Sequence, residues 1–142
     1  MNFDLQIRQL EVVPILEFTY HGQIPSLNHI YGQDRRTGRR YLKPEGKMFK
    51  TNIRSLIKTR PPEVMWYTVE TWFERQIVYK NGKPYRWDMD DYYKLIFDAV
   101  SKKIGIDDCR FRRHIAEKNP GKGTLLFRLY PWKEDQWEHQ RQ

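Results

Sequence analysis

Apolar residues recur with the spacing of strands in two stretches of the N-terminal half. Residues 12–20, VVPILEFTY, are β-branched and aromatic, and Pro14 places the expected strand at a sheet edge or delays its start. Residues 64–80, VMWYTVETWFERQIVYK, alternate and are rich in aromatic residues, so we expect a long strand there. The sequence NGKP at 81–84 then predicts a hairpin turn.

Two other stretches have the periodicity of helices. The first helix is expected to begin at Pro44 and to end before the two prolines at 61–62. Its apolar positions at roughly helical spacing are Met48, Ile53, Leu56 and Ile57. The second helix is expected from Asp90 to about Ile104, with Gly105 as its C-terminal stop.

The remaining segments complete a mixed fold. Residues 21–33, HGQIPSLNHIYGQ, predict a loop, and CRFRRHIAEK and TLLFRLYPW predict two strands joined by the turn NPGKG. We therefore expect an α+β fold with a mixed, mostly antiparallel sheet and two main helices. The chain is expected to form a single domain over residues 1–142, with its core at about 12–131 and a frayed polar tail at 132–142.

The charge of the chain indicates which class of partner it binds. The chain has 26 Lys and Arg against 18 Asp and Glu, a net charge of +8, which favours a polyanionic partner. Residues 35–60 hold ten Lys and Arg and one acid, Glu45. So many uncompensated cations favour a surface that contacts phosphates over a merely solvated helix face. The candidate DNA-binding residues are Arg35, Arg36, Arg39, Arg40, Lys43 and Lys47.

Several classes of protein are excluded or disfavoured. Cys109 is the only cysteine, so the chain can form no internal disulfide and no cysteine zinc site. The N-terminal residues lack the pattern of a signal peptide, and no apolar run approaches the roughly 20 residues that span a bilayer. We expect a cytoplasmic protein with no membrane partner and no small-molecule organic cofactor.

Six aspartates fall within residues 88–108 of this basic chain. On the predicted helix, Asp90, Lys94 and Asp98 lie at i, i+4 and i+8, on one face. Asp88 directly precedes the helix, so its carboxylate can converge with that of Asp90. Carboxylates packed closely are driven toward protonation unless a cation shares them. Hard oxygen ligands of this kind suit Mg²⁺, with Mn²⁺ as an alternative.

The last two aspartates, Asp107 and Asp108, follow the helix. If the next strand pairs beside the strand that leads into the helix, we expect one of them to meet Asp88 and Asp90 at one end of the sheet. A set of three carboxylates would then be complete within one chain.

Each of these residues also has a structural interpretation. Asp88 can be an N-cap, and Asp90 and Asp91 can be first-turn acids favoured by the helix dipole. The series at 90, 94 and 98 can be a surface ladder of ion pairs, and the pair at 107–108 can open a turn. The combination of DxD, a spaced lysine and DD in a phosphate-seeking protein favours metal-dependent phosphoryl chemistry.

This combination resembles a known motif. WDMDDYYKLIFDAVSKKIGIDD is similar to the DxDN-xx-K-xxx-DAL-…-DD signature of the RusA family of Holliday junction resolvases. PSLNHIYG at 25–32 resembles that family's PPS-x-N motif, and GRRYLKPEGKMFKTNI resembles its basic strand-to-helix segment. The motifs follow in the same order over most of residues 12–130. Two positions depart from the pattern: Asp91 stands where the family has Asn, and Ile24 replaces the first proline.

The resemblance implies a RusA-like α+β fold, a homodimer and Mg²⁺-dependent paired nicks across four-way DNA junctions in recombination and repair. Resolvases of this family are often encoded by prophages. Carried over by position, the essential acids and metal ligands fall on Asp88, Asp90 and Asp108, and the catalytic lysine on Lys94. Asp107 is then an additional candidate ligand. Asp91 and Asp98 would support the site without contacting the metal.

Alternatives remain open for function and for single residues. The rival functions are an inactive nucleic-acid-binding protein of the same fold, and a Mg²⁺ nuclease for flaps or plain duplex. Lys94 can stabilise the transition-state oxyanion or form a salt bridge to Asp90 or Asp98. Tyr31 can stack on an unpaired base or pack in the core. The histidines, interpreted as surface or loop residues because their spacing does not suit a metal, are His21, His29 and His114.

Overall fold

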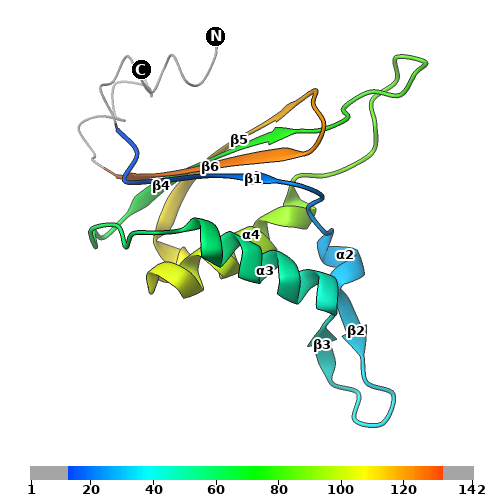
Figure 1. The fold of residues 1–142 in the computed structure, drawn as a ribbon, viewed down its shortest axis with the longest axis horizontal. Coiled ribbons are helices and arrows are strands. Elements are labelled where there is room, and N and C mark those ends of the chain that lie inside the picture. Colours follow the sequence, from blue (N-terminus) through cyan, green and yellow to red (C-terminus); the bar gives the residue numbers. More distant parts are fainter. Residues whose placement is uncertain (1–12, 133–142) are drawn as a thin grey trace.

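Four strands form the main sheet in the computed structural model, which describes residues 13–132 (Figure 1). In the order in which they lie side by side, they are β1 (Leu16–His21), β6 (Thr124–Pro131), β4 (Tyr67–Glu74) and β5 (Phe111–Asn119). β6 runs antiparallel to both of its neighbours, whereas β5 runs parallel to β4. The prediction of a single α+β domain with a mixed, mostly antiparallel sheet is confirmed.

Two helices, α3 (Pro44–Leu56) and α4 (Asp90–Ile104), pack against one face of this sheet (Figure 1). α4 begins and ends where the sequence predicts, and Gly105 ends it with a left-handed φ of 70°. The hydrophobic core lies between the helices and the sheet, and its fully buried side chains include Ile53, Leu95 and Phe127. The sheet and the two helices thus hold the termini of α4 in fixed places.

The predicted apolar face of α3 is partly wrong. Met48 is 66% exposed and Leu56 is 38% exposed, whereas Phe49, Ile53 and the following Ile57 are buried. The buried residues are spaced by four, so they form one stripe along the helix, and Met48 and Leu56 each lie one position, or about 100°, away from it.

The loop predicted at residues 21–33 also needs correction. It contains a short helix, α2 (Leu27–Ile30), and a strand, β2 (Tyr31–Gln33), that pairs with β3 (Arg40–Leu42). The β2–β3 hairpin projects away from the main sheet (Figure 1). Its tip is closed by the Asp34 carboxylate, which accepts hydrogen bonds from the backbone amides at positions 36 and 37. The basic segment therefore forms a structured hairpin.

Strand lengths and partners differ in detail from the expectations. β4 ends at Glu74, and the chain continues into a projecting loop in which a bridge between Val78 and Pro84 closes the predicted turn. β1 begins late, at Leu16, and lies at an edge of the sheet. β5 and β6 both pair with β4, which lies between them. The predicted polar tail lies outside the described residues, apart from residue 132.

Among residues 13–132, no helix is long and apolar enough to cross a membrane.

Candidate active site

Two candidate carboxylates lie at the N-terminus of α4. The N-cap position belongs to Met89, whose φ of −60° and ψ of −32° are already helical, so Asp88 precedes the cap. Asp88 and Asp90 are both exposed to solvent. The interpretation of Asp88 as the capping residue is therefore not supported, and both carboxylates are accessible to a ligand. Asp90 keeps the favourable place of an acid in the first turn.

Lys94 lies on the solvent-facing side of α4. At 100° per residue, Lys94 and Asp98 lie about 40° and 80° around the helix from Asp90. The carboxylate of Asp98 pairs with the ammonium group of Lys50 on α3, at 3.9 Å. Among residues 13–132, no ion pair joins Lys94 to Asp90 or Asp98. The ion-pair ladder is therefore not formed, and the Lys94 ammonium is available for an anionic ligand.

At the other end of α4, Asp107 and Asp108 have different roles. Asp107 caps a short 3₁₀ helix, η1 (Asp108–Arg110), because its carboxylate accepts a hydrogen bond from the Cys109 amide at 2.9 Å. This bond lowers the pKa of Asp107. Partial burial raises the pKa of Asp108, and the adjacent charges of Asp107 and Asp98 raise it further. The turn-forming role is confirmed for Asp107, while Asp108 remains a candidate ligand.

The expectation that these carboxylates meet within one chain is wrong. β5 is parallel to β4, and its first residue, Phe111, pairs with Tyr67 at the beginning of β4. Asp108 therefore lies near the beginning of β4, whereas Asp88 follows its end. α4, which has fifteen residues and is about 22 Å long, separates the two groups. Within residues 13–132, no three His, Cys, Asp or Glu side chains lie close enough together to hold a metal ion.

A half-buried polar group lies beneath the first turns of α4. His114 on β5 shares a hydrogen bond with Thr71 on β4, with 2.8 Å between Nε2 and Oγ1. The rings of Tyr93 and Phe97 pack against its imidazole, with centroids 4.1 and 5.0 Å away. His114 is therefore not the surface or loop residue that its spacing suggested. Alternation along β5 did not reveal this position, because the register of β5 against β4 shifts after Phe111, so that Phe111 and His114 both contact Phe97.

Burial is the main cause of the pKa shifts of His114 and Tyr93. It lowers the pKa of His114 to about 4, although the negative charge of Asp90 opposes the shift. Burial also raises the pKa of Tyr93 to about 12, and Asp90 adds to this effect. Both side chains are therefore neutral near pH 7. They form an uncharged support beneath the Asp90 end of α4.

The stability of the metal-free protein should fall as the pH drops from 6.5 to 4. His114 takes up a proton near pH 6.5 in the unfolded chain but only near pH 4 in the folded one, so acid favours unfolding in this interval. One such group changes the free energy of unfolding by at most about 1.4 kcal/mol per pH unit, and its remaining solvent exposure reduces this value. Replacement His114→Gln should weaken this pH dependence in urea unfolding. An unchanged dependence would contradict the assigned burial of His114.

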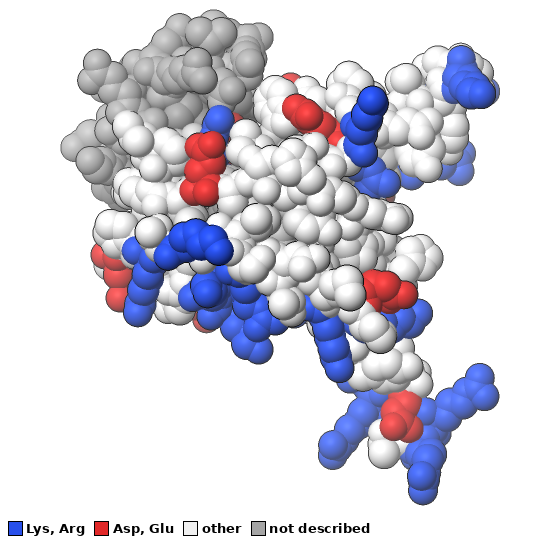
Figure 2. All heavy atoms as spheres, viewed as in Figure 1, with Lys and Arg blue, Asp and Glu red and all other residues white. Residues whose placement is uncertain are grey.

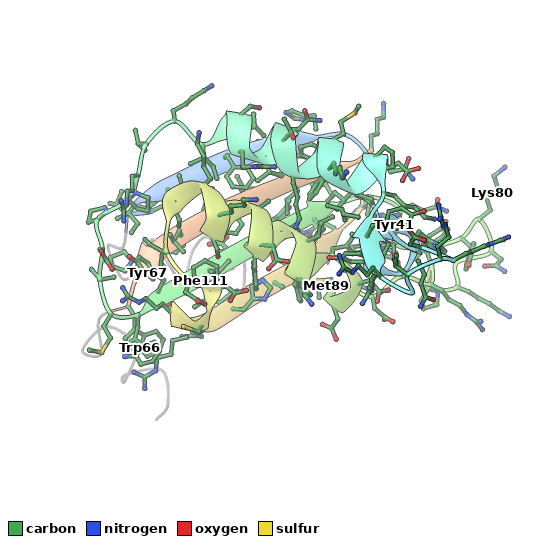
Figure 3. The ribbon with its side chains drawn as sticks, turned by 90° about the horizontal axis from the view of Figure 1, so that it is seen from below. Tyr41, Trp66, Tyr67, Lys80, Met89 and Phe111 are labelled. Atoms are coloured by element: carbon green, nitrogen blue, oxygen red, sulfur yellow. The ribbon has the colours of Figure 1, made fainter. Side chains whose placement is uncertain are left out.

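The six predicted DNA-binding cations follow one another along the β2–β3 hairpin and the beginning of α3. Lys and Arg side chains surround one acidic side chain at the end of the hairpin (Figure 2), and the residues at 35, 36, 39 and 40 are all exposed. Lys43 is the N-cap residue of α3, and Lys47 is exposed on its first turns. The hairpin lies at the end of the molecule where α4 begins, as the labels of Tyr41 and Met89 show (Figure 3).

Comparison with known proteins finds no family model that matches the chain and no curated protein that is significantly similar to it. The function of the site is therefore argued from the chemistry and positions of its residues.

The two tyrosines of the hairpin have different environments. Tyr31 packs against the core, and the guanidinium of Arg40 lies 4.0 Å from the centre of its ring. The core-packing interpretation of Tyr31 is therefore supported. Tyr41 is 52% exposed and lies across Gly32 of the neighbouring strand, where a Cβ atom would come within 2.4 Å of its ring. Sequence reasoning missed Tyr41, because its exposure depends on the pairing of β2 with β3.

Proposed function

We propose that the protein is a metal-dependent endonuclease that binds four-way DNA junctions and nicks two of their strands symmetrically. The observation that carries the proposal is the combination of groups at one end of the molecule. Two exposed carboxylates, Asp88 and Asp90, lie beside Lys94, which has no ion-pair partner among the described residues, and the basic hairpin projects from the same end. These groups suit a phosphodiester and the cation that neutralises it.

The donor chemistry fits Mg²⁺ or Mn²⁺, but one chain does not bring enough donors together. These cations prefer carboxylate and water oxygens, and of the three proposed ligands Asp88 and Asp90 precede or begin α4, while Asp108 lies beyond its far end. We propose that a homodimer completes the set. If the α4 helices of two subunits run antiparallel across a two-fold axis, Asp108 of the partner subunit approaches Asp88 and Asp90. A dimer has two such sites, as paired nicks require.

The side chains of this chain would act by holding and neutralising the DNA backbone. A bound divalent cation lowers the pKa of a coordinated water and polarises a phosphoryl oxygen. Lys94, one turn into α4, would place its ammonium group against the oxyanion that develops on the phosphate. The arginines of the hairpin would bind phosphates of the junction arms and so detect the shape of the DNA. Neutral His114 and Tyr93 support the helix turn that carries Asp90.

A panel of substrates tests this proposal against its rivals. Equal amounts of a labelled four-way junction, a flap and a plain duplex are incubated with the protein and Mg²⁺. We expect rapid symmetric nicking of the junction alone. Faster cutting of the flap or duplex would indicate a different Mg²⁺ nuclease. Binding without any cutting would indicate an inactive nucleic-acid-binding protein.

Replacing the hairpin arginines should weaken binding to every form of DNA. The variant with Arg35, Arg36, Arg39 and Arg40 all changed to Ala loses four phosphate contacts. Each lost contact reduces the slope of log affinity against log salt by about 0.9, so the slope should fall by roughly 3 to 4. Binding measured between low and physiological salt provides the slope. The same substitutions should lower the unfolding midpoint only slightly, because all four side chains are exposed and the contact of Arg40 with the Tyr31 ring contributes little at an exposed site. An unchanged slope would show that the hairpin does not contact DNA.

A further inference from the structure

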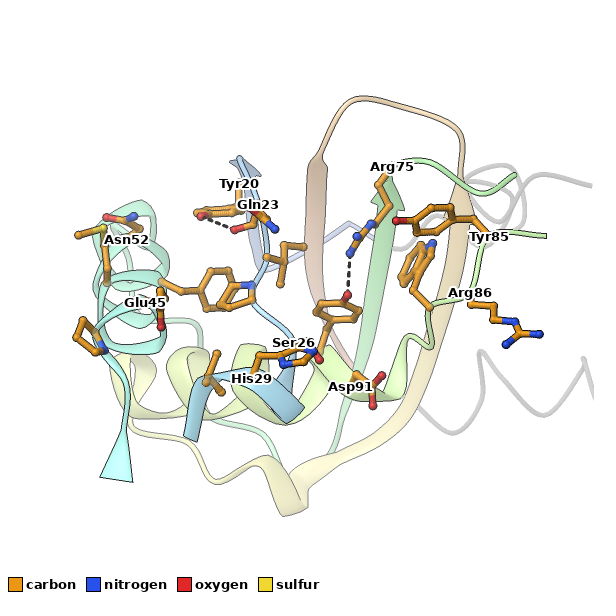
Figure 4. Close-up of a pocket in the computed structure, with 18 residues that line it drawn as sticks. Tyr20, Gln23, Ser26, His29, Glu45, Asn52, Arg75, Tyr85, Arg86 and Asp91 are labelled. Carbon is orange, nitrogen blue, oxygen red and sulfur yellow. Dashed lines mark hydrogen bonds between the residues drawn. The ribbon is translucent and has the colours of Figure 1, made fainter. Parts of the chain in front are cut away.

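A pocket of about 860 Å³ lies beside the N-terminus of α4 (Figure 4). Its walls come from the end of β1 and the following loop, from the first turns of α3, and from the segment that leads into α4. Asp91 lies at its edge, one residue after the candidate ligand Asp90. The pocket therefore adjoins the proposed active site without sharing its carboxylate ligands.

Aromatic side chains in the pocket wall are held in fixed orientations. The rings of Trp87 and Tyr92 meet edge to face, with centroids 5.7 Å apart. The guanidinium of Arg75 donates a hydrogen bond of 2.8 Å to the Tyr92 hydroxyl and lies 4.7 Å from the centre of the Trp87 ring. The indole N–H of Trp87 in turn donates to the backbone carbonyl of residue 76. This wall is formed before any ligand binds.

Two basic projections flank the pocket. One is the β2–β3 hairpin, and the other is the loop of residues 76–86, which carries Lys80, Lys83 and Arg86 (Figures 1 and 2). Both projections lie at the same end of the molecule, as the labels of Tyr41 and Lys80 show (Figure 3). α3 follows the hairpin directly and supplies one wall, and the end of the loop supplies another. A strand of nucleic acid held by both projections would therefore pass over the pocket.

We propose that this pocket receives one nucleobase turned out of the stack at the branch point of the DNA. The inference rests on the proposed function, because it requires a branched DNA ligand. A base that has already lost a stacking neighbour is the least costly to turn out. The half-buried ring of Tyr85 offers a face or an edge to the base, and the projections bind the flanking phosphates. The exposed amides of Gln23 and Asn52 line the pocket and offer a donor and an acceptor to the base edge.

Photochemical cross-linking tests the pocket directly. Junctions carrying 5-iododeoxyuridine at the branch, or in the middle of one arm, are irradiated with the protein in EDTA, and the linked residue is identified by mass spectrometry. We expect cross-links to Tyr85 only from the branch position. Asn52→Trp, which fills the pocket, should reduce them at least tenfold. Thr51→Trp, on the same helix but outside the pocket, should leave them unchanged.

The possible outcomes distinguish failure of the pocket proposal from failure of the proposed function. Equal duplex binding by both tryptophan variants establishes that they are folded. Cross-links confined to residues of the two projections that do not line the pocket, or cross-links that survive Asn52→Trp, overturn the pocket proposal while junction binding stands. Failure of the wild-type protein to bind the junction more tightly than duplex overturns both proposals.

Discussion

A mixture of the Asp90→Asn and Asp108→Asn proteins should nick junctions, although each variant alone should be at least about a thousandfold slower than wild type. In the proposed dimer, each site takes Asp90 from one subunit and Asp108 from the other. A mixed dimer then has one site with both defects and one site with neither. Random pairing makes half of the dimers mixed, so roughly a quarter of the wild-type number of sites should be restored.

The control for this experiment is a mixture of the Asp88→Asn and Asp90→Asn proteins. Both substitutions affect the carboxylates at the beginning of α4, so each site in that mixed dimer keeps one defect and the mixture should stay inactive. Light scattering establishes that the proteins are dimers and exchange subunits under the conditions used. Activity of a monomer, or mixed dimers of Asp90→Asn and Asp108→Asn that remain inactive, would show that the site is not shared between subunits.

The same substitution at two adjacent aspartates in the first turn of α4 should have different effects on nicking. Asp90→Asn should abolish nicking while junction binding survives or tightens, because a negative charge near the phosphate is lost. Asp91 lies about 100° around the helix from Asp90 and lines the neighbouring pocket. Asp91→Asn should therefore keep or increase nicking and improve junction affinity.

Single-turnover rates for the two variants on one junction, across Mg²⁺ and Mn²⁺ titrations, measure this difference. Asp91→Asn is the matched control for Asp90→Asn, since the two substitutions remove the same charge from the same helix turn. Equal and complete loss of nicking in both would make Asp91 itself a ligand. Full activity of Asp90→Asn would mean that the site is assigned to the wrong residues.

Local signals were sufficient to predict α4 and its two ends. Acids in the first turn, apolar residues at helical spacing and Gly105 at the stop all act within a few residues of one another, and the structure follows them. The existence of β1, β5 and β6 was also predictable from β-branched and aromatic runs. These features describe most of the sheet and the helix that carries the candidate carboxylates.

Pairing between distant segments was not predictable in the same way. The short strand β2 has its partner in the basic segment, so its residues on their own suggested a loop. The parallel pairing of β5 with β4 determines which end of the sheet Asp108 occupies. A parallel crossover returns the chain to the end where the first strand began, and this separates Asp108 from Asp88. Sequence spacing therefore identified the acidic residues but not their distribution between two ends of a helix.

The most direct test of the central claim is incubation of the purified protein with an end-labelled four-way junction in Mg²⁺ and, separately, in EDTA. The proposed function predicts two symmetrically placed nicks in Mg²⁺ and intact DNA in EDTA, with junction binding in both. Nicking that persists in EDTA would contradict the metal dependence. A junction that is bound but left intact in both Mg²⁺ and Mn²⁺ would contradict the assignment of this protein as a nuclease.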